Sequence, residues 1–231
     1  MTTNFGQFFL DSIPNLLTGL GNTLILTFIS ITAGFIIGIV LALGKVYGNK
    51  IINGFCVAYI ELIRGTPLLV QLFIIYYGLP SIGIIFTPIQ AALLGLSINS
   101  SAYQAEYLRG SIQAIQSGQM MAARSIGLNK LKSIQHIILP QALRISIPSW
   151  SNEFVYLLQY SSIVYIIQVE ELTAEGIFIA ASNFRYIEIL TMIAIIYLSL
   201  TVVSTEIIDR IARHFSIPGI GAAKPVRLRD A

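Results

Sequence analysis

Long apolar stretches alternate with short polar ones along the whole chain. The first uncharged stretch, 20–43, is long enough as a helix to cross about 30 Å of hydrocarbon. Four more apolar stretches follow, at about 54–79, 89–108, 145–169 and 189–207. A long polar segment, about 110–144, separates the third stretch from the fourth. The pattern predicts five transmembrane helices and one large loop in a single domain, 1–231.

The composition agrees with a membrane protein. Hydrophobic residues make up 55% of the chain, the mean hydropathy is +0.77, and only 11% of the residues are charged. A soluble domain carries about 25% charged residues. The net charge of +3 does not indicate a nucleic-acid partner, because the basic residues cluster at span ends and in loops. We therefore expect an all-α integral membrane protein in contact with lipid.

The distribution of Lys and Arg predicts the orientation in the membrane. The loop after the first span contains Lys45 and Lys50, and the 110–144 loop and the tail at 209–231 are also basic. The amino terminus and the remaining loops are not basic. Basic loops face the cytoplasm, so we expect the amino terminus outside and the carboxyl terminus inside. Residues 1–17 are expected to form an amphipathic or irregular lead-in.

Two glycine motifs and two charge motifs occur in the first three spans. Gly34 and Gly38 form a GxxxG pair, which indicates either a helix-packing face or only the usual frequency of glycine in membrane helices. Glu61 and Arg64 lie on one helix face and can pair. The Gly-Thr-Pro at 65–67 predicts a kink. The same E-x-x-R-G pattern returns at 106–110 and predicts a similar charge pair there.

Glu153 is the strongest candidate for a functional side chain. A carboxylate in the hydrocarbon costs on the order of 3 kcal/mol, and no Lys or Arg lies within a helical turn of it. Its partner must come from another helix, another chain or a cationic ligand. Tyr156, Tyr160 and Ser161 follow at spacings of three, seven and eight, so they can line the same face. A carboxylate among aromatic rings suits a guanidinium or ammonium group.

The hypothetical substrate site consists of Glu153, Asn152, Asn99, Tyr160 and Ser161. The alternative is a structural Glu153, either hydrogen-bonded to neighbouring helices or protonated by burial. The acidic residues Glu170, Glu171 and Glu175 are expected to form a solvated loop, although they could also attract cations or dock a binding protein.

The sequence indicates no enzyme. It contains no phosphate-binding loop of the G-x-x-x-x-G-K-[ST] type, so we expect no ATP bound to this chain. It also lacks a G-x-S-x-G elbow and an H-E-x-x-H motif. His136 and His214 have no second ligand at metal-binding spacing, so no metal site is predicted.

The polar loop contains a specific spacing. Ala122 and Ala123 precede Gly127, nine residues separate Gly127 from Ile137, and Leu139 and Pro140 follow. The segment 119–126 can form about two helical turns between glycines. Pro140 is expected to interrupt a helix and to disfavour helical geometry in Leu139.

This spacing resembles the cytoplasmic "EAA" loop of the membrane subunits of ABC importers. The segment ELIRGTPLLVQL at 61–72, the segments 102–115 and 122–148, and the Ser-Asn-Glu at 151–153 are similar to permeases of the polar amino-acid family, the histidine/glutamine/arginine permeases. The family usually has Glu before the two alanines, where this chain has Met121. Met121 could pack into an apolar groove of the partner instead.

The resemblance implies a type I ABC importer permease that dimerises in the prokaryotic plasma membrane. Each loop would bind an ATPase subunit through Met121, Ala122, Ala123, Gly127, Ile137, Leu139 and Pro140. ATP and Mg would bind that ATPase, and an extracytoplasmic binding protein would deliver the amino acid. The second permease chain is expected to be an identical copy, with a sister subunit as the alternative.

In this family a Glu after Asn in the fourth helix is associated with basic amino acids. We therefore expect arginine, lysine or histidine as the substrate. Two alternatives stay open: the same architecture importing a neutral or acidic amino acid such as glutamine, and a self-contained proton-coupled transporter or channel.

Overall fold

The computed structural model describes residues 5–115 and 117–215, and all regular structure in these ranges is helical. The expectation of an all-α fold is confirmed. The α-helices are α1 (Phe5–Tyr47), α2 (Lys50–Arg64), α3 (Leu68–Phe73), α4 (Pro88–Ala114), α5 (Ser117–Ser125), α6 (Lys130–Ser133), α7 (Leu139–Tyr160), α8 (Leu172–Asn183) and α9 (Tyr186–Phe215). Two π-helical turns, η1 (Ile74–Gly78) and η3 (Ile134–Ile138), and two 3₁₀ segments, η2 (Leu79–Ile82) and η4 (Ser161–Ile167), connect them.

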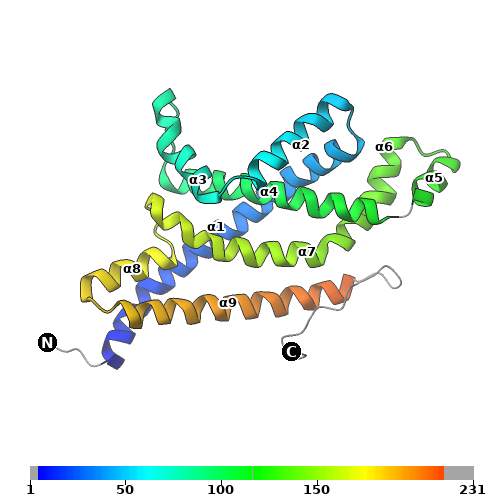
Figure 1. The fold of residues 1–231 in the computed structure, drawn as a ribbon. Helices are drawn as coiled ribbons and strands as arrows, with labels where there is room; N and C mark the ends of the chain where they lie inside the picture. The colour runs from blue at the N-terminus through cyan, green and yellow to red at the C-terminus, as the bar shows by residue number, and fades with distance from the viewer. Residues whose placement is uncertain (1–4, 116, 216–231) are drawn as a thin grey trace.

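Four long helices form the body of the molecule. Helix α1 packs along α4, α4 packs against α7, and α7 packs against α9 (Figure 1). Helix α8 joins α1 to α9 at one end, while α5 and α6 project at the other end. The predicted basic tail lies mostly beyond Phe215, outside the described residues.

The interface between α1 and α4 is built on small residues. A Cβ atom added to Gly34 would lie 3.0 Å from Ser100 Cβ, and one added to Gly38 would lie 3.1 Å from Gln104 Cβ. Such distances are shorter than ordinary contacts between side chains. Of the two sequence interpretations of the GxxxG pair, the structure therefore favours the helix-packing face.

Replacing Gly38 with valine is expected to force α1 and α4 apart. Overpacking a close interface costs about 1–3 kcal/mol, and here the nearest atoms include the Ala105 backbone nitrogen at 3.2 Å. The apparent melting temperature of the purified chain should fall. Gly54→Val is the matched control, because Gly54 is also helical and nothing lies within 4 Å of its added Cβ. Equal melting temperatures for the two variants would contradict the packing role.

The predicted kink in the second span is present. Helix α2 ends at Arg64, and the segment beginning at Leu68 leaves it at 102°. The side-chain amide of Gln71 donates to the carbonyl of Ile63 at 2.7 Å and to that of Thr66 at 3.1 Å. These bonds satisfy acceptors that the break exposes, so the bend is a fixed feature of the fold.

Two described helices are long and apolar enough to cross a membrane by themselves, Gly6–Tyr47 and Tyr186–Ala212. The bent pair Lys50–Arg64 and Leu68–Ile82 adds a third if it counts as one span. Helices α4 and α7 are more polar, and several of their polar residues are buried in the structure, as the next section describes. The five spans and their limits stay a prediction.

One local expectation was wrong, and another is narrowed. Of the two alternatives for the lead-in, amphipathic or irregular, the irregular one is excluded from residue 5 onward, because α1 begins at Phe5 and contains Pro14. Pro140 does not interrupt the chain's helical course: Leu139 is helical, with φ −60° and ψ −44°. The reason is that Pro140 lies in the first turn of α7, where proline is tolerated. The π turn that precedes α7 is closed by a hydrogen bond from the Leu139 N–H to the Ile134 carbonyl.

Candidate functional site

Glu153 lies on the face of α7 that packs against α4, and only 5% of it is exposed. The hydroxyl of Ser100 donates to Glu153 Oε1 at 2.7 Å. The hydroxyl of Tyr107 forms a second side-chain hydrogen bond with the same carboxyl group. Ser100 and Tyr107 are seven residues apart on α4, so they share a helix face. The carboxyl group is thus held by two hydroxyls from one neighbouring helix.

The hydrogen-bonding network continues from Ser100 into α1. The amide nitrogen of Gln104 donates to Ser100 Oγ at 2.9 Å and to the carbonyl of Ile31 at 3.1 Å. Ser100 and Gln104 are both buried. This chain of bonds joins α1, α4 and α7, the three helices around Glu153.

No ion pair between Glu153 and a Lys or Arg side chain occurs in the part of the chain that the structure describes. The sequence argument required a partner from outside α7, and α4 supplies neutral hydroxyls. A buried carboxylate that meets only hydroxyls retains the ability to bind a cation that approaches it. The arrangement is therefore chemically suited to an ammonium or guanidinium group.

The other predicted substrate residues do not gather around Glu153. Asn99 is buried, and its amide donates to Gln71 Oε1 at 3.1 Å, beside the bend after α2. Ser161 is also buried, and its hydroxyl donates to the Leu158 carbonyl. Asn152 and Tyr160 are exposed. The structure therefore associates the carboxyl group with side chains of α4 and not with these four.

The predicted aromatic face on α7 also differs from the structure. Glu153 is buried, whereas Tyr156 and Tyr160 are 51% and 43% exposed and stack on each other with ring centroids 6.3 Å apart. The α-helix ends at Tyr160 and continues as a 3₁₀ segment, so Ser161, at the spacing of eight, no longer lies on the α-helical face. Sequence reasoning missed Tyr107. The seven-residue spacing from Ser100 was the signal that could have found it.

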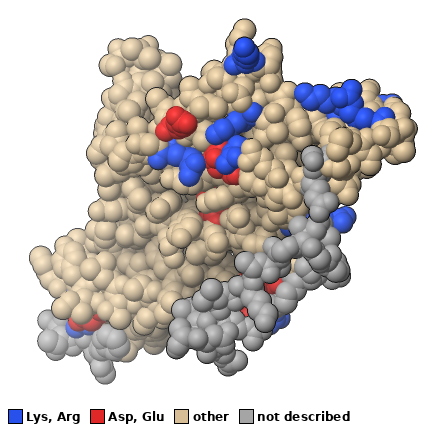
Figure 2. Space-filling model, turned by 45° about the vertical axis from the view of Figure 1, so that its right-hand side comes forward, with Lys and Arg blue, Asp and Glu red and all other residues tan. Residues whose placement is uncertain are grey.

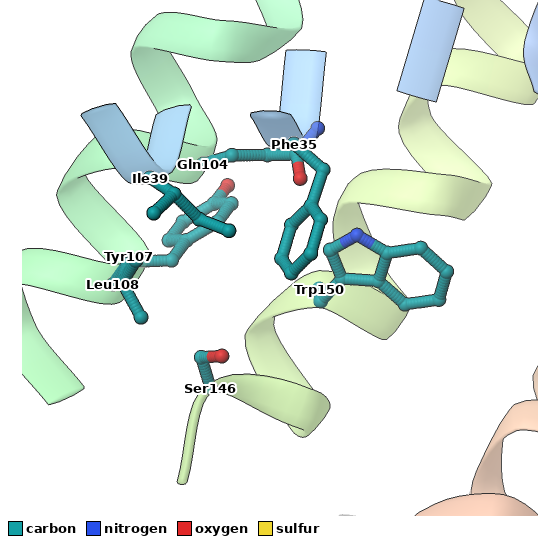
Figure 3. A pocket seen from close by; sticks show the side chains of 7 residues that line it. All are labelled: Phe35, Ile39, Gln104, Tyr107, Leu108, Ser146 and Trp150. Carbon is teal, nitrogen blue, oxygen red and sulfur yellow. The ribbon is translucent and has the colours of Figure 1, made fainter. Parts of the chain in front are cut away.

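A small cavity lies beside this network (Figure 3). The volume of the cavity that is accessible to water is about 10 Å³. Its walls are the side chains of Phe35, Ile39, Gln104, Tyr107, Leu108, Ser146 and Trp150. This space is too small for an amino acid, and Glu153 itself is buried, so the structure has no room for a substrate beside its carboxyl group in this conformation.

A cluster of charges surrounds Glu106 of α4. Lys45 of α1 lies 2.7 Å from its carboxylate, Arg109 3.0 Å and Arg64 of α2 3.8 Å. Figure 2 shows basic and acidic side chains gathered near the middle of one face, with a separate group of basic side chains at its upper right. The predicted pair between Glu106 and Arg109 is present. The predicted partner of Arg64 was wrong, because Arg64 pairs with Glu106 rather than with Glu61 and also lies over the Tyr103 ring.

The polar loop contains a short helix with an exposed apolar surface. In α5, Met121 is 64% exposed, Ala122 is exposed, and Ala123 is buried. Gly127 has φ +87°, which favours glycine, and its N–H donates to the Arg124 carbonyl at 3.0 Å. Further along the loop, Ile137 and Leu139 pack partly buried against a cluster of α1 and α4 residues, while Pro140 is exposed. The loop thus presents α5 outward and is anchored to the body through its second half.

The acidic segment before α8 is not fully solvated, and that expectation was wrong for Glu171. Its side chain is completely buried and caps α8, accepting from the N–H groups of Thr173 at 2.9 Å and Ala174 at 2.8 Å. It also accepts from the hydroxyl of Tyr197 of α9 at 3.0 Å. Burial raises the pKa of the Glu171 carboxyl, and these hydrogen bonds act in the opposite direction. Glu171 therefore connects the start of α8 to α9 through hydrogen bonds.

Residues 31–217 match the family of binding-protein-dependent transport system inner membrane components. The chain belongs to this family. It is 36% identical to the probable amino-acid ABC transporter permease YckA of Bacillus subtilis, over 89% of this chain and 92% of that protein. It is 36% identical to the glutamine transport permease GlnP of Escherichia coli, over 89% and 95%. The nopaline transport permease NocM of Agrobacterium fabrum is 32% identical, over 87% and 88%.

Solved structures of ABC transporters also match this chain. A crystal structure of an amino acid ABC transporter with histidines matches with a TM-score of 0.85 at 39% identity, over 93% of this chain and all of that chain. The methionine transporter MetNI in an inward-facing conformation matches with a TM-score of 0.73 at 21% identity, over 89% and 98%, which shows a common fold. The resemblance to polar amino-acid permeases is thus confirmed. The protein is an all-α integral membrane permease with the type I ABC importer fold, and such permeases are transport subunits rather than enzymes.

Proposed function

We propose that this permease moves cationic amino acids, namely arginine, lysine or histidine, through the membrane by alternating access. The observation that carries the proposal is Glu153: a buried carboxyl group, on a helix of the bundle, that meets hydroxyls and no basic side chain among the described residues. Ionisable residues within membrane helices usually mark a substrate or ion pathway. A cationic side chain of the substrate supplies the counter-charge that the protein does not.

Tyr107 and Ser100 position the carboxyl group for this contact. Their bonds fix Glu153 against α4 in the closed conformation. When the helices separate, the cation takes a place beside Glu153, and Asn99, Asn152, Tyr160 and Ser161 become its neighbours only if the opening also brings them toward Glu153. Differential affinity for the closed and open conformations couples the substrate to the motion.

Coupling to ATP requires partner subunits. We propose that α5, with exposed Met121 and Ala122, docks on an ABC ATPase that binds ATP and Mg, and that two permease chains form a dimer, a homodimer by preference. The exposed Met121 suits an apolar groove. An extracytoplasmic binding protein delivers the substrate. The basic loops then face the cytoplasm, which leaves the amino terminus outside and the carboxyl terminus inside.

Glutamine is the second candidate substrate. It is supported by the 36% identity to a glutamine transport permease, and under this alternative Glu153 is a structural residue satisfied by Ser100 and Tyr107. The names of the relatives also include nopaline, and the similar crystal structure contains histidines. Charge complementarity at Glu153 is the reason for preferring cationic amino acids.

Competition for uptake tests the proposal. The permease is co-purified with its native partners, reconstituted in liposomes and supplied with ATP, and uptake of labelled arginine is measured. An excess of lysine or histidine should reduce the uptake strongly, and an excess of glutamine or glutamate should not. Inhibition by glutamine equal to that by lysine would favour the second candidate. Uptake driven by a pH gradient without ATP would instead support a self-contained proton-coupled transporter.

A further inference from the structure

The lining of the cavity beside Glu153 includes unsatisfied polar atoms. Two buried polar atoms of the residues that line it, Gln104 Oε1 and Trp150 Nε1, have no hydrogen-bond partner among the residues that the structure describes. Gln104 as a whole is only 4% exposed. An unsatisfied buried donor or acceptor costs about 1–3 kcal/mol. One acceptor and one donor from the lining of the same cavity therefore need a partner.

The orientation of the Gln104 amide is fixed by its other bonds. Its nitrogen donates to Ser100 Oγ at 2.9 Å and to the Ile31 carbonyl at 3.1 Å. The Ser100 hydroxyl proton is already donated to Glu153, so Ser100 can only accept from Gln104. Rotating the amide would bring its oxygen against two acceptors. Gln104 Oε1 must therefore accept from a group other than these, and Trp150 Nε1 can only donate.

Two hydroxyl-bearing side chains of the same wall can complete the site. Ser146 Oγ donates to the Leu143 carbonyl at 2.8 Å, and the hydroxyl of Tyr107 is hydrogen-bonded to Glu153. Each hydroxyl keeps acceptor capacity for a further bond. Gln104 and Tyr107 come from α4 and Trp150 from α7, and their side chains surround one space in Figure 3.

We propose that this cavity binds one internal water molecule. The water accepts from Trp150 Nε1 and donates to Gln104 Oε1 and to the hydroxyl oxygen of Tyr107 or Ser146. Buried waters make about three such bonds, and a cavity of about 10 Å³ corresponds to about one water molecule. The water links α4 to α7 beside the hydrogen-bonding network that holds the Glu153 carboxyl group. The site exists whichever amino acid the permease transports.

One competing partner for Trp150 is present in the structure. The Phe35 ring lies edge-on to the indole, with ring centroids 6.4 Å apart and an interplanar angle of 72°. An N–H···π contact with Phe35 could take the indole proton. That contact would leave Gln104 Oε1 without a donor, so the water is the partner that satisfies both atoms.

Trp150 is the only tryptophan of the chain, so its spectroscopic signals can be assigned without ambiguity. The full-length chain is placed in lipid nanodiscs, and ultraviolet resonance Raman spectra are recorded for the indole band that reports hydrogen bonding of the N–H. The wild-type band should lie at the hydrogen-bonded position. Ser146→Val adds apolar bulk to the cavity and displaces the water, so the band should move to the unbonded position and the fluorescence emission should shift to shorter wavelength.

Ser151→Val is the matched control. Ser151 is a buried serine of the same helix whose hydroxyl donates to a backbone carbonyl, as that of Ser146 does, but it does not line the cavity. Its variant should leave the band unchanged. A wild-type band at the unbonded position, or no difference between Ser146→Val and the wild type, would overturn the proposal. If Ser146→Val does not fold, Phe35→Leu distinguishes water from the Phe35 ring as the partner of the indole N–H. An N–H bonded to water keeps the band at the hydrogen-bonded position. An N–H bonded to the Phe35 ring shifts the band to the unbonded position.

Discussion

Replacing Glu171 with alanine is expected to destabilise the protein by about 2–4 kcal/mol. The substitution removes the side-chain cap of α8, which is worth about 1 kcal/mol. The cap consists of the bonds accepted from the N–H groups of Thr173 and Ala174. The substitution also removes the carboxylate acceptor of the half-buried Tyr197 hydroxyl. Unsatisfied buried donors cost about 1–3 kcal/mol each. Since Glu171 connects α8 with α9 and lies within 3.5 Å of the Thr23 hydroxyl of α1, three helices lose a common contact.

Thermal unfolding of the detergent-solubilised chain measures this effect. A loss of this size lowers the melting temperature by about 10 °C for a chain of this length. Glu170→Ala is the control, because Glu170 is the adjacent acidic residue and its side chain is exposed. Its melting temperature should equal that of the wild type. Equal stability of the two variants would mean that Glu171 does not hold the three helices together.

The helical fold and the family were predictable from the sequence because both depend on local patterns. Apolar stretches identify membrane helices by length alone, and the loop spacing from Ala122 to Pro140 is fixed along the chain. The kink after α2 was also predictable, since Gly-Thr-Pro breaks a helix in any surroundings. None of these features depends on which helix packs beside which.

The partners of the charged and polar residues were not predictable, because they depend on the neighbouring helix. Glu61 and Arg64 have the spacing of a helical pair, yet Arg64 reaches Glu106 of α4. Glu153 was singled out by its cost in hydrocarbon, and in the structure its partners are Ser100 and Tyr107 and not the tyrosines of its own helix. Glu171 was read as solvated, since an acidic residue in a loop is usually exposed; its burial depends on Tyr197, 26 residues further along.

Close packing of α1 on α4 explains why the polar network can be so compact. Gly34 and Gly38 bring the α1 backbone near enough for Gln104 to reach the Ile31 carbonyl while it also bonds Ser100. A larger side chain at either glycine would therefore act on Glu153 indirectly, through the position of Ser100. The stability of the helix pair and the placement of the candidate carboxyl group share one set of contacts.

Replacing Glu153 with glutamine is expected to raise the arginine concentration needed for half-maximal uptake by about 10- to 100-fold. A hydrogen bond to a charged group contributes about 1.5–3 kcal/mol, and each 1.4 kcal/mol is a factor of ten. Glutamine keeps nearly the same shape, and its amide oxygen can still accept from Ser100. Folding and recovery of the partner ATPase should therefore change little, while binding of the cationic side chain is lost.

Glu61→Gln is the control for this experiment, because Glu61 is an exposed carboxylate of α2 and its loss removes the same charge from the chain. Uptake is measured with reconstituted complexes at several arginine concentrations, beside the melting temperature of each variant. Unchanged arginine uptake in Glu153→Gln would contradict the proposed cation contact. A variant that loses stability and all transport together would show a structural Glu153, as the glutamine alternative requires. Only a selective loss for cationic amino acids, at wild-type stability, places the substrate's charge at this carboxyl group.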